Sequence, residues 1–375
     1  THSALRITPY TNEEDFDRTG RDKFLPRTTL AGAIQMCTYQ VLSSKRYGRS
    51  YIEAITPIGT GLASQWAGSV CYPIMAVEGY ATEAGTARYR RRHAQCQADH
   101  FRPLQGVGAS SIGFGTYLGD PTAATDQLYA QAAEAAVALG CNVIDTAINY
   151  RCQRSERTIG ATVESLISRG TIAREELLLC TKGGYLPFDG EVPQDPGRYV
   201  IDTFLSPGII AYEELVAGCH CLSPRYLDHQ LSRSLANLRV GTIDVYYLHN
   251  PEQQLEAIPR DTFLSRLEAA FALLERKVQE GAIRWYGTAT WKGYRANPQE
   301  EGYLSLAALV ELAEHVGGPS HHFRVIQLPY NLAMPEAHAF KNQRVKGEPV
   351  SLLEAARALG VSVIISPSLL QSQLT

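Results

Sequence analysis

The sequence predicts an α/β fold, a (β/α)8 TIM barrel that is truncated after its seventh strand and follows an irregular N-terminal extension. Two observations lead to this prediction. From position 110 onward, short apolar runs typical of buried strands alternate with amphipathic helical stretches, which is the pattern of parallel βαβ units. Seven such units follow one another, and this order favours a barrel over an open doubly wound sheet.

The predicted elements can be placed in chain order. The strands are expected at 110–116, 142–148, 177–182, 243–249, 283–290, 324–330 and 361–367. The helices are expected at 123–139, 154–169, 224–238, 261–280, 304–316 and 351–359. Four helices are followed directly by a glycine, a residue that commonly ends a helix. These glycines are Gly140, Gly170, Gly281 and Gly360. A closed barrel needs one more helix, strand and helix, so we expect a C-terminal truncation.

The N-terminal part lacks this pattern. Residues 1–100 are predicted to be an extension, and residues 101–375 are predicted to form the barrel domain. Residues 1–74 show no sustained helical or strand period, so no fold is predicted for them. A start of translation at Met75 and an ordinary N-terminal extension are both compatible with this segment. A polar helix is expected at 82–98.

Composition excludes several classes of protein. The chain has 375 residues and a formal net charge of −3, which gives no reason to expect nucleic acid as a partner. No apolar run reaches about 20 residues, the length of a membrane-spanning helix, so no membrane association is expected. The eight cysteines are scattered and suit a reducing compartment better than a disulfide framework. We therefore expect a cytoplasmic protein, whose oligomeric state is left open.

Titratable side chains stand at or just past the C-terminal ends of three predicted strands, where barrel enzymes build their active sites. They are Asp145, Tyr150, Lys182 and His249. Each residue alone also fits a structural role, such as a loop cap or a packing residue. The ordered set on three consecutive strands therefore carries the functional prediction.

These side chains suit the delivery of a proton to a carbonyl oxygen while hydride adds to the carbon. Tyr150 is a sensible proton donor, although a free phenol has a pKa of about 10. The Lys182 ammonium is expected to lower that pKa, and Asp145 is expected to hold Lys182 in place. His249 can donate a hydrogen bond to the carbonyl oxygen and orient it.

In this order the set resembles that of the aldo-keto reductases. The resemblance extends over about 105–375 and includes several further motifs. These are Gly-Phe-Gly-Thr-Tyr (113–117), Asn-Val-Ile-Asp-Thr-Ala-Ile-Asn-Tyr (142–150), Thr-Lys-Gly-Gly (181–184), Tyr-Leu-His-Asn-Pro (247–251) and Gln-Leu-Pro-Tyr-Asn (327–331). The resemblance implies an oxidoreductase that reduces an aldehyde or ketone, a small-molecule carbonyl substrate, to an alcohol. It also implies NADPH, or less often NADH, as the cofactor.

The resemblance also implies which residues contact this cofactor. Gly115, Thr116 and Tyr117 lie where the backbone of the family approaches it. Thr290 and Gln327 are expected at the nicotinamide carboxamide, although many relatives carry Ser-Asn where this chain has Ala289-Thr290. The loop beside the pyrophosphate is expected to include Ser366, Leu369 and Ser372. The family binds the adenosine phosphate after strand 8, so the choice between NADPH and NADH stays open.

Other interpretations compete with catalysis. The chain could be a cofactor-binding regulatory subunit, as some barrels of this family are, or an inactive fragment of such an enzyme. Turnover of a panel of aldehydes distinguishes these possibilities from an enzyme. Cys219-His220-Cys221 suggests a metal site but lacks a second ligand pair at a familiar spacing, so no metal is predicted. Gly106-x-Gly108 and Gly113-x-Gly115 lack the full dinucleotide-binding fingerprint.

One connection is unusually long for a barrel. Residues 183–223 separate the third predicted strand from its helix, whereas such loops commonly span about 2–6 residues. The segment is rich in aromatic residues and leaves its strand directly beside Lys182. We expect it to form a lid over the barrel mouth that lines an apolar substrate pocket; packing on the outer helices is the alternative.

Overall fold

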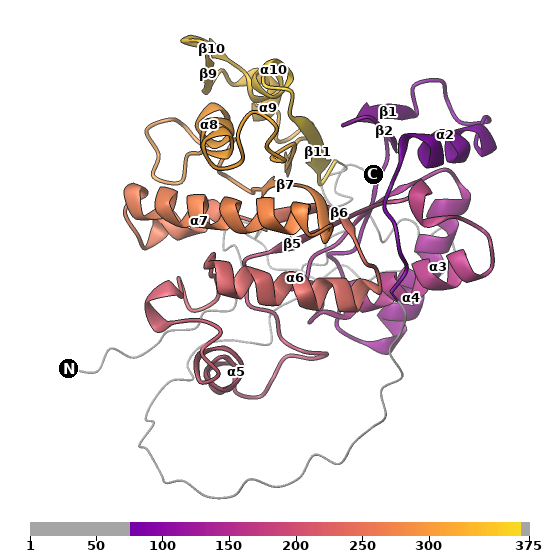
Figure 1. The fold of residues 1–375 in the computed structure, drawn as a ribbon, viewed down its shortest axis with the longest axis horizontal. Coiled ribbons are helices and arrows are strands. Elements are labelled where there is room, and N and C mark those ends of the chain that lie inside the picture. The colour runs from indigo at the N-terminus through magenta and orange to yellow at the C-terminus, as the bar shows by residue number, and fades with distance from the viewer. Residues whose placement is uncertain (1–75, 369–375) are drawn as a thin grey trace, which may run out of the picture.

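The computed structural model describes residues 76–368, and a seven-stranded parallel sheet forms their centre (Figure 1). The strands are β3 (Phe114–Gly115), β4 (Val143–Asp145), β5 (Leu178–Gly183), β6 (Ile243–His249), β7 (Ile283–Ala289), β8 (Val325–Pro329) and β11 (Ser362–Ser366). They lie side by side in chain order, and every neighbouring pair is parallel. In the described part of the chain β3 and β11 are not paired. The predicted parallel barrel with a gap after its seventh strand is therefore confirmed.

Helices cover the outer face of this sheet. They are α3 (Ala123–Ala138), α4 (Arg154–Ser168), α6 (Pro224–Leu238), α7 (Arg260–Gln279), α8 (Leu306–Gly317) and α10 (Leu352–Ala358). Each lies within two residues of its predicted bounds at either end. Neighbouring helices contact one another in chain order, and Figure 1 shows α6 and α7 side by side across the sheet. No helix among residues 76–368 is both long enough and apolar enough to span a bilayer.

Local chemistry explains where several helices begin and end. The hydroxyl of Thr122 accepts a hydrogen bond from the Thr125 amide at the start of α3, and Ser305 serves α8 in the same way. Ser351 and Glu354 form a reciprocal capping box at the start of α10. The four glycines predicted to end helices all have φ between 67° and 101°, a range that favours glycine.

The strands alternate between two cores. In β6, Tyr246 and Leu248 pack against the helices, whereas Val245 and Tyr247 belong to a cluster on the inner face. Successive side chains of a strand point to opposite faces, so His249 shares the inner face with Val245 and Tyr247. By the same rule Lys182 shares the inner face with Cys180 of β5. This alternation directs the polar residues at the strand ends into the barrel mouth.

The first predicted strand, 110–116, is wrong in its extent. An antiparallel hairpin of β1 (Phe101–Leu104) and β2 (Val107–Ser110) precedes a β3 of only two residues. The Ser110 amide donates to Asn142 Oδ1 at 2.7 Å, and the Asn142 amide donates to Ser110 Oγ at 3.0 Å. These bonds end the hairpin at Ser110, before the chain joins the sheet. The predicted strand 110–116 thus includes the last residue of β2 and all of β3.

The hairpin closes the N-terminal end of the barrel. Its inward residues Leu104 and Val107 belong to the inner-face cluster. At the hairpin turn, Gln105 Nε2 reaches the Arg324 carbonyl, the Gly360 carbonyl and Ser362 Oγ at 3.0–3.3 Å. The hairpin therefore reaches the chain segments that lead into β8 and β11, on the far side of the gap.

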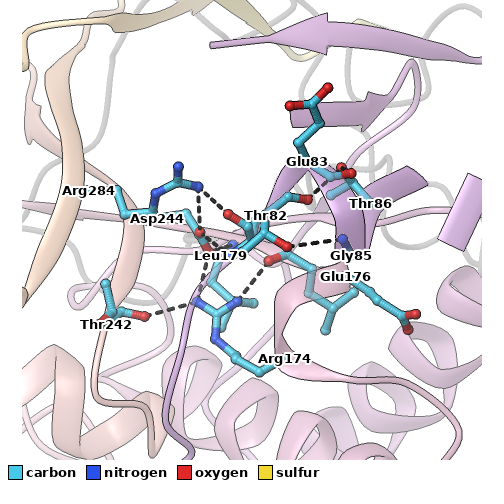
Figure 2. Close-up of polar contacts among 12 residues, drawn as sticks. Thr82, Glu83, Gly85, Thr86, Arg174, Glu176, Leu179, Thr242, Asp244 and Arg284 are labelled. Carbon is cyan, nitrogen blue, oxygen red and sulfur yellow. Dashed lines mark hydrogen bonds and ion pairs between the residues drawn. The ribbon is translucent and has the colours of Figure 1, made fainter. Parts of the chain in front are cut away.

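The segment before the hairpin also packs on the barrel. Its helix α2 (Glu83–Arg92) ends six residues before the predicted limit of 98. The N-cap Thr82 accepts a hydrogen bond from the Gly85 amide at 3.0 Å (Figure 2). Arg88 and Arg92 both pair with the buried Glu176. A boundary between extension and barrel at residue 100 stays a prediction, and Met75 lies outside the described residues.

Asp244 is the centre of a buried polar network below this helix (Figure 2). Its Oδ1 accepts the Ala81 amide at 2.8 Å. Its Oδ2 accepts Arg174 Nη2 at 2.7 Å and the Leu179 amide at 2.9 Å. Arg284 lies 3.9 Å from Oδ1 and also donates to the Ala81 carbonyl. The network ties the segment before α2 to β5, β6 and β7.

Two smaller features complete the fold. A second hairpin, β9 (Gln343–Val345) and β10 (Glu348–Val350), and the short helix α9 (Glu336–Ala339) lie between β8 and α10. A side chain at Gly287 would place its Cβ 1.6 Å from the Val325 carbonyl oxygen. Only glycine therefore allows β7 to approach β8 this closely.

Candidate active site

The structure brings the four predicted catalytic side chains together at the C-terminal end of the sheet. Lys182 of β5 is 1% exposed and pairs with Asp145 of β4, with 2.6 Å between Nζ and Oδ2. Lys182 Nζ also donates to the Thr146 carbonyl at 2.8 Å and lies 4.9 Å from the centroid of the Tyr150 ring. Asp145 raises the pKa of Lys182, so the ammonium stays charged despite burial.

Tyr150 lies between the ammonium and the imidazole. Lys182 Nζ is 4.9 Å from the centroid of its ring, and the His249 ring centroid is 5.8 Å away. Burial raises the pKa of Tyr150 to about 12, and the opposing effect of Lys182 does not overcome it. Lys182 lowers this pKa as expected, but the opposite effect of burial is larger. The phenol is protonated at neutral pH, which is the form that a proton donor requires.

His249 is the last residue of β6, and its ring packs against two tyrosine rings. The centroid of the Tyr185 ring is 5.0 Å from that of the imidazole, and the centroid of the Tyr150 ring is 5.8 Å from it. Burial, together with the nearby Lys182 charge, holds the pKa of His249 well below its ordinary value. A neutral imidazole carries one N–H, which can donate to a carbonyl oxygen. Nδ1 of His249 is buried and has no hydrogen-bond partner among the described residues.

A chain of hydrogen bonds from Arg266 through Gln254 and His220 reaches the backbone carbonyl of His249. His220 Nε2 lies 2.8 Å from the His249 carbonyl oxygen, and His220 Nδ1 lies 2.8 Å from Gln254 Nε2. Arg266 donates to Gln254 Oε1 at 2.6 Å, which turns the amide nitrogen of Gln254 toward His220. His220 is therefore a neutral imidazole that donates from Nε2. Burial lowers its pKa to about 4.

In the Cys219-His220-Cys221 motif, His220 and Cys221 form hydrogen bonds with other groups of the protein. Both ring nitrogens of His220 have protein partners, and Cys221 Sγ accepts the Ser223 amide at 3.4 Å. Across residues 76–368, no group of three or more His, Cys, Asp or Glu side chains is arranged to hold a metal ion.

The two residues expected at the nicotinamide lie beside this cluster. Gln327 is the register partner of Ala289, which in turn is the partner of His249. Gln327 Nε2 donates to Asp145 Oδ1 at 3.0 Å. Thr290 is 4% exposed, and its Oγ1 has no partner in the described part of the chain. A buried hydroxyl without a partner fits a site that a polar ligand group completes.

The three residues expected on the first strand differ in their exposure. A Cβ at Gly115 would meet no atom within 4 Å, so open space lies beside its backbone. Thr116 is buried, and its hydroxyl donates to Thr146 Oγ1 at 2.8 Å. Tyr117 is 47% exposed, and its ring lies 4.9 Å from that of Tyr150. Gly115 and Tyr117 thus border the mouth, whereas the Thr116 side chain packs behind it.

The expected pyrophosphate loop is only partly described. Ser366 ends β11, and its carbonyl accepts the Tyr330 amide at 2.9 Å. It belongs to the same end of the sheet as Gln327, because it is the register partner of Pro329 at the end of β8. Leu369 and Ser372 lie outside the described residues.

Two contributions to the site were missed from the sequence. The Thr146 carbonyl, which holds Lys182, has no signature in a sequence because every residue carries a carbonyl. Tyr185 packs on His249 and donates to Gln253, while Asn250 donates to its hydroxyl at 3.2 Å. Its position three residues after Lys182 in Thr-Lys-Gly-Gly-Tyr is the one signal that could have indicated it.

The segment 183–223 folds into its own small core. Phe204, Ile210 and Cys221 pack with Tyr226 in the first turn of α6, and Figure 1 shows the short helix α5 (Pro196–Val200) beyond α6. These contacts are with an outer helix, which is the packing expected under the alternative interpretation. Residues near its beginning, such as Tyr185, do contact the site, so a role in substrate choice stays a prediction.

Comparison with protein families finds one match. The model described as "Aldo/keto reductase family" matches residues 111–309, just over half of the chain. The matched range contains Asp145, Tyr150, Lys182 and His249.

Curated relatives align over a shorter range. Prostaglandin F synthase 1 of Bos taurus is 24% identical over 152 residues, which are 40% of this chain and 33% of the relative. Aldo-keto reductase family 1 member C13 of Mus musculus is 26% identical over 141 residues, which are 38% of this chain and 32% of the relative. The chain thus spans about a third of the length of these relatives.

Solved structures with a similar fold include two bacterial proteins. The holo form of an aldo-keto reductase from Bacillus halodurans is 19% identical, with a TM-score of 0.46. The match covers 71% of this chain and 65% of the Bacillus halodurans chain. An aldo/keto reductase from Klebsiella pneumoniae in complex with NADP and acetate is 18% identical, covers 72% and 68%, and has a TM-score of 0.46.

Proposed function

The chain belongs to the aldo/keto reductase family, and from this premise we propose that it reduces an aldehyde or ketone to an alcohol with NADPH. One observation carries the proposal: the ion pair of Lys182 and Asp145 and the His249 ring both lie beside a protonated Tyr150. This arrangement offers a proton and a second hydrogen bond to one carbonyl oxygen.

Each side chain has a proposed role. Tyr150 donates its phenolic proton to the substrate oxygen as that oxygen gains negative charge. Lys182 stabilises the phenolate left behind, and Asp145 keeps Lys182 charged and in place. His249, neutral because of its burial, orients the substrate oxygen through its N–H.

NADPH supplies the hydride when it is bound. Thr290 and Gln327 are the residues proposed to bind its carboxamide, and the unpartnered hydroxyl of Thr290 supports this assignment. The open space at Gly115 and the exposed ring of Tyr117 suit a cofactor lying across the mouth. The Ser366 loop, with Leu369 and Ser372, is proposed for the pyrophosphate. Six cysteines in the described part are free thiols, which suits a cytoplasmic location.

Turnover and binding test the proposal together. The purified chain is given NADPH or NADH and a panel of aldehydes and ketones, and cofactor oxidation is followed by absorbance. We expect consumption of NADPH that depends on the carbonyl compound and is lost in Tyr150→Phe. NADPH binding without turnover of any carbonyl would instead indicate a cofactor-sensing protein. Equal turnover by the unmodified chain and Tyr150→Phe would remove Tyr150 from the proposed role.

A further inference from the structure

Three successive residues directly after Tyr150 have left-handed backbone conformations. The φ angles of Arg151, Cys152 and Gln153 are 49°, 55° and 68°. Residues with a Cβ rarely adopt this conformation, and each costs about 1 kcal/mol or more. A run of three therefore persists only where surrounding contacts impose it.

Arg151 supplies the contacts on one side of this turn. Its side chain is 1% exposed and pairs with Asp126 at the start of α3. Its Nε donates to the Asp120 carbonyl at 3.1 Å, and its Nη2 donates to the Thr122 carbonyl at 3.3 Å. The guanidinium also lies 5.0 Å from the centroid of the Tyr129 ring. Arg151 thus fixes the loop between β3 and α3 against the turn.

That loop carries an aromatic residue that touches the proton donor. Tyr129 donates from its hydroxyl to the Leu118 carbonyl at 2.8 Å, next to Tyr117. The Tyr117 ring in turn packs 4.9 Å from the Tyr150 ring. Arg151 therefore acts on Tyr150 along two routes, through the backbone that joins them and through the loop that carries Tyr117.

The other side of the turn is held by the segment 183–223. The Gly190 amide donates to the Cys152 carbonyl at 2.9 Å. Gln153 Nε2 donates to the Phe188 carbonyl at 3.0 Å. Both contacts use the backbone of the segment. The turn is consequently clamped between the first βα loop and the long connection after β5.

We propose that Arg151 is a positioning residue for Tyr150, and that the turn 151–153 sets the place of the phenol relative to Lys182 and His249. The inference rests on the proposed function, in which Tyr150 is the proton donor. Stability alone explains Arg151 poorly, because buried ion pairs often stabilise less than apolar residues of the same size. Its Nη1 is also buried without a partner among the described residues.

The first readout needs no turnover. The Cζ resonance of Tyr150 is recorded at neutral pH in protein labelled with 13C-tyrosine and is assigned with Tyr150→Phe. We expect Arg151→Met to shift this resonance. Arg154→Met is the matched control, because Arg154 shares Asp126 with Arg151, whereas the hydrogen bonds to the carbonyls of 120 and 122 come from Arg151. Arg154→Met should leave the resonance in place.

The second readout is kinetic. A displacement of the donor by about 1 Å can reduce turnover about 100-fold, so Arg151→Met should lower kcat about 10–100-fold per folded molecule. The pH profile of kcat should also shift, because the Tyr150 phenol would lie differently against Lys182. Arg154→Met should change neither. If Arg151→Met does not fold, Asp126→Asn replaces it, with the same directions expected.

The outcomes separate this inference from the proposed function. A shifted Tyr150 resonance in Arg151→Met, with Arg154→Met unchanged, supports the positioning role even if no carbonyl compound is turned over. An unchanged resonance in both Arg151→Met and Asp126→Asn overturns it, even if the unmodified chain is an active reductase. Lower thermal stability with an unchanged Tyr150 resonance, kcat and pH profile also overturns it, because the role is then structural only.

Discussion

The two ends of the barrel each contain an aspartate paired with a buried cation, yet the two pairs are built differently. Asp244, at the N-terminal end, accepts two backbone amides as well as the Arg174 guanidinium (Figure 2). Asp145, at the C-terminal end, is held by two side chains, Lys182 and Gln327. One carboxylate is fixed by the backbone, and the other by groups that can also serve a ligand.

The groups that surround the Asp244 and Asp145 ion pairs can be compared in the same way. Asp244 is fully buried, and the segment before α2 contacts it through the Ala81 amide. Around the Asp145 pair, buried atoms of Asn149, His249 and Thr290 have no partner within the described part of the chain. The comparison teaches that a buried ion pair alone does not mark a functional site. Arg174 Nε, beside Asp244, is likewise buried without a partner in the described part of the chain, so the two ends differ in what holds each carboxylate: backbone amides for Asp244 and side chains for Asp145.

The sharpest test of this comparison is Tyr150→Phe at the C-terminal end. Loss of a general acid typically costs about 10²–10⁴-fold in turnover. We expect a decrease in kcat of that size, measured with NADPH and the best carbonyl substrate. The urea midpoint of unfolding should change little, because a ring of the same shape remains. A decrease in stability matching the loss of activity would contradict a purely chemical role.

At the N-terminal end the expected effect is on stability. Asp244→Ala leaves the Arg174 guanidinium buried without its carboxylate, which typically costs about 3–5 kcal/mol of unfolding free energy. Asp228→Ala is the matched control, because Asp228 pairs with Lys277 at 2.8 Å and is 46% exposed. Loss of an exposed pair costs about 0–1 kcal/mol. Urea unfolding of both variants compares them, and equal losses would refute the distinction between the two pairs.

The third prediction concerns His220, which hydrogen-bonds the His249 carbonyl, and the loss of unfolding free energy at acidic pH. Burial lowers the pKa of His220 to about 4 from an ordinary 6.5. Its contribution to stability is therefore complete above about pH 6.5 and is lost as the pH falls toward 4. The full loss corresponds to about 3 kcal/mol. His220→Gln should flatten the unfolding free energy measured between pH 7 and pH 4 by about this amount. Parallel pH profiles for the two proteins would show that His220 does not titrate in this range.

The smallest expected effect concerns the gap between the first and seventh strands. Gln105→Ala removes the hydrogen bonds that join the hairpin turn to Arg324, Gly360 and Ser362. We expect a loss of about 1 kcal/mol in unfolding free energy. Turnover should stay normal, since these contacts lie at the opposite end from Tyr150. A loss of turnover in this variant would show that the two ends are coupled.

Sequence periodicity predicted the regular elements well where the elements are long. The bounds of β6 and α6 agree with prediction to the residue, because both have sustained patterns of one period. The first strand was wrong because a hairpin strand and a barrel strand follow each other within ten residues. Their separation depends on the contact between Ser110 and Asn142, which lies in another part of the chain.

In the candidate site, too, local sequence predicted some features, and contacts between distant segments decided others. Residue types at strand ends indicated Asp145, Tyr150, Lys182 and His249. The sequence contains the charge of Lys182, which lowers the Tyr150 pKa, but not the extent of burial, which raises that pKa to about 12. The contact of Gln327 with Asp145 joins residues 182 positions apart and could not be predicted from local pattern.

The sequence by itself determined the order of strands and helices and the chemical groups at the strand ends. Both depend on local period and residue type, which survive without tertiary contacts. Only the tertiary structure decided which groups are desolvated, which polar atoms lack partners and how the turn after Tyr150 is held. These properties depend on burial and on contacts between distant segments, and such contacts form only when the sheet assembles.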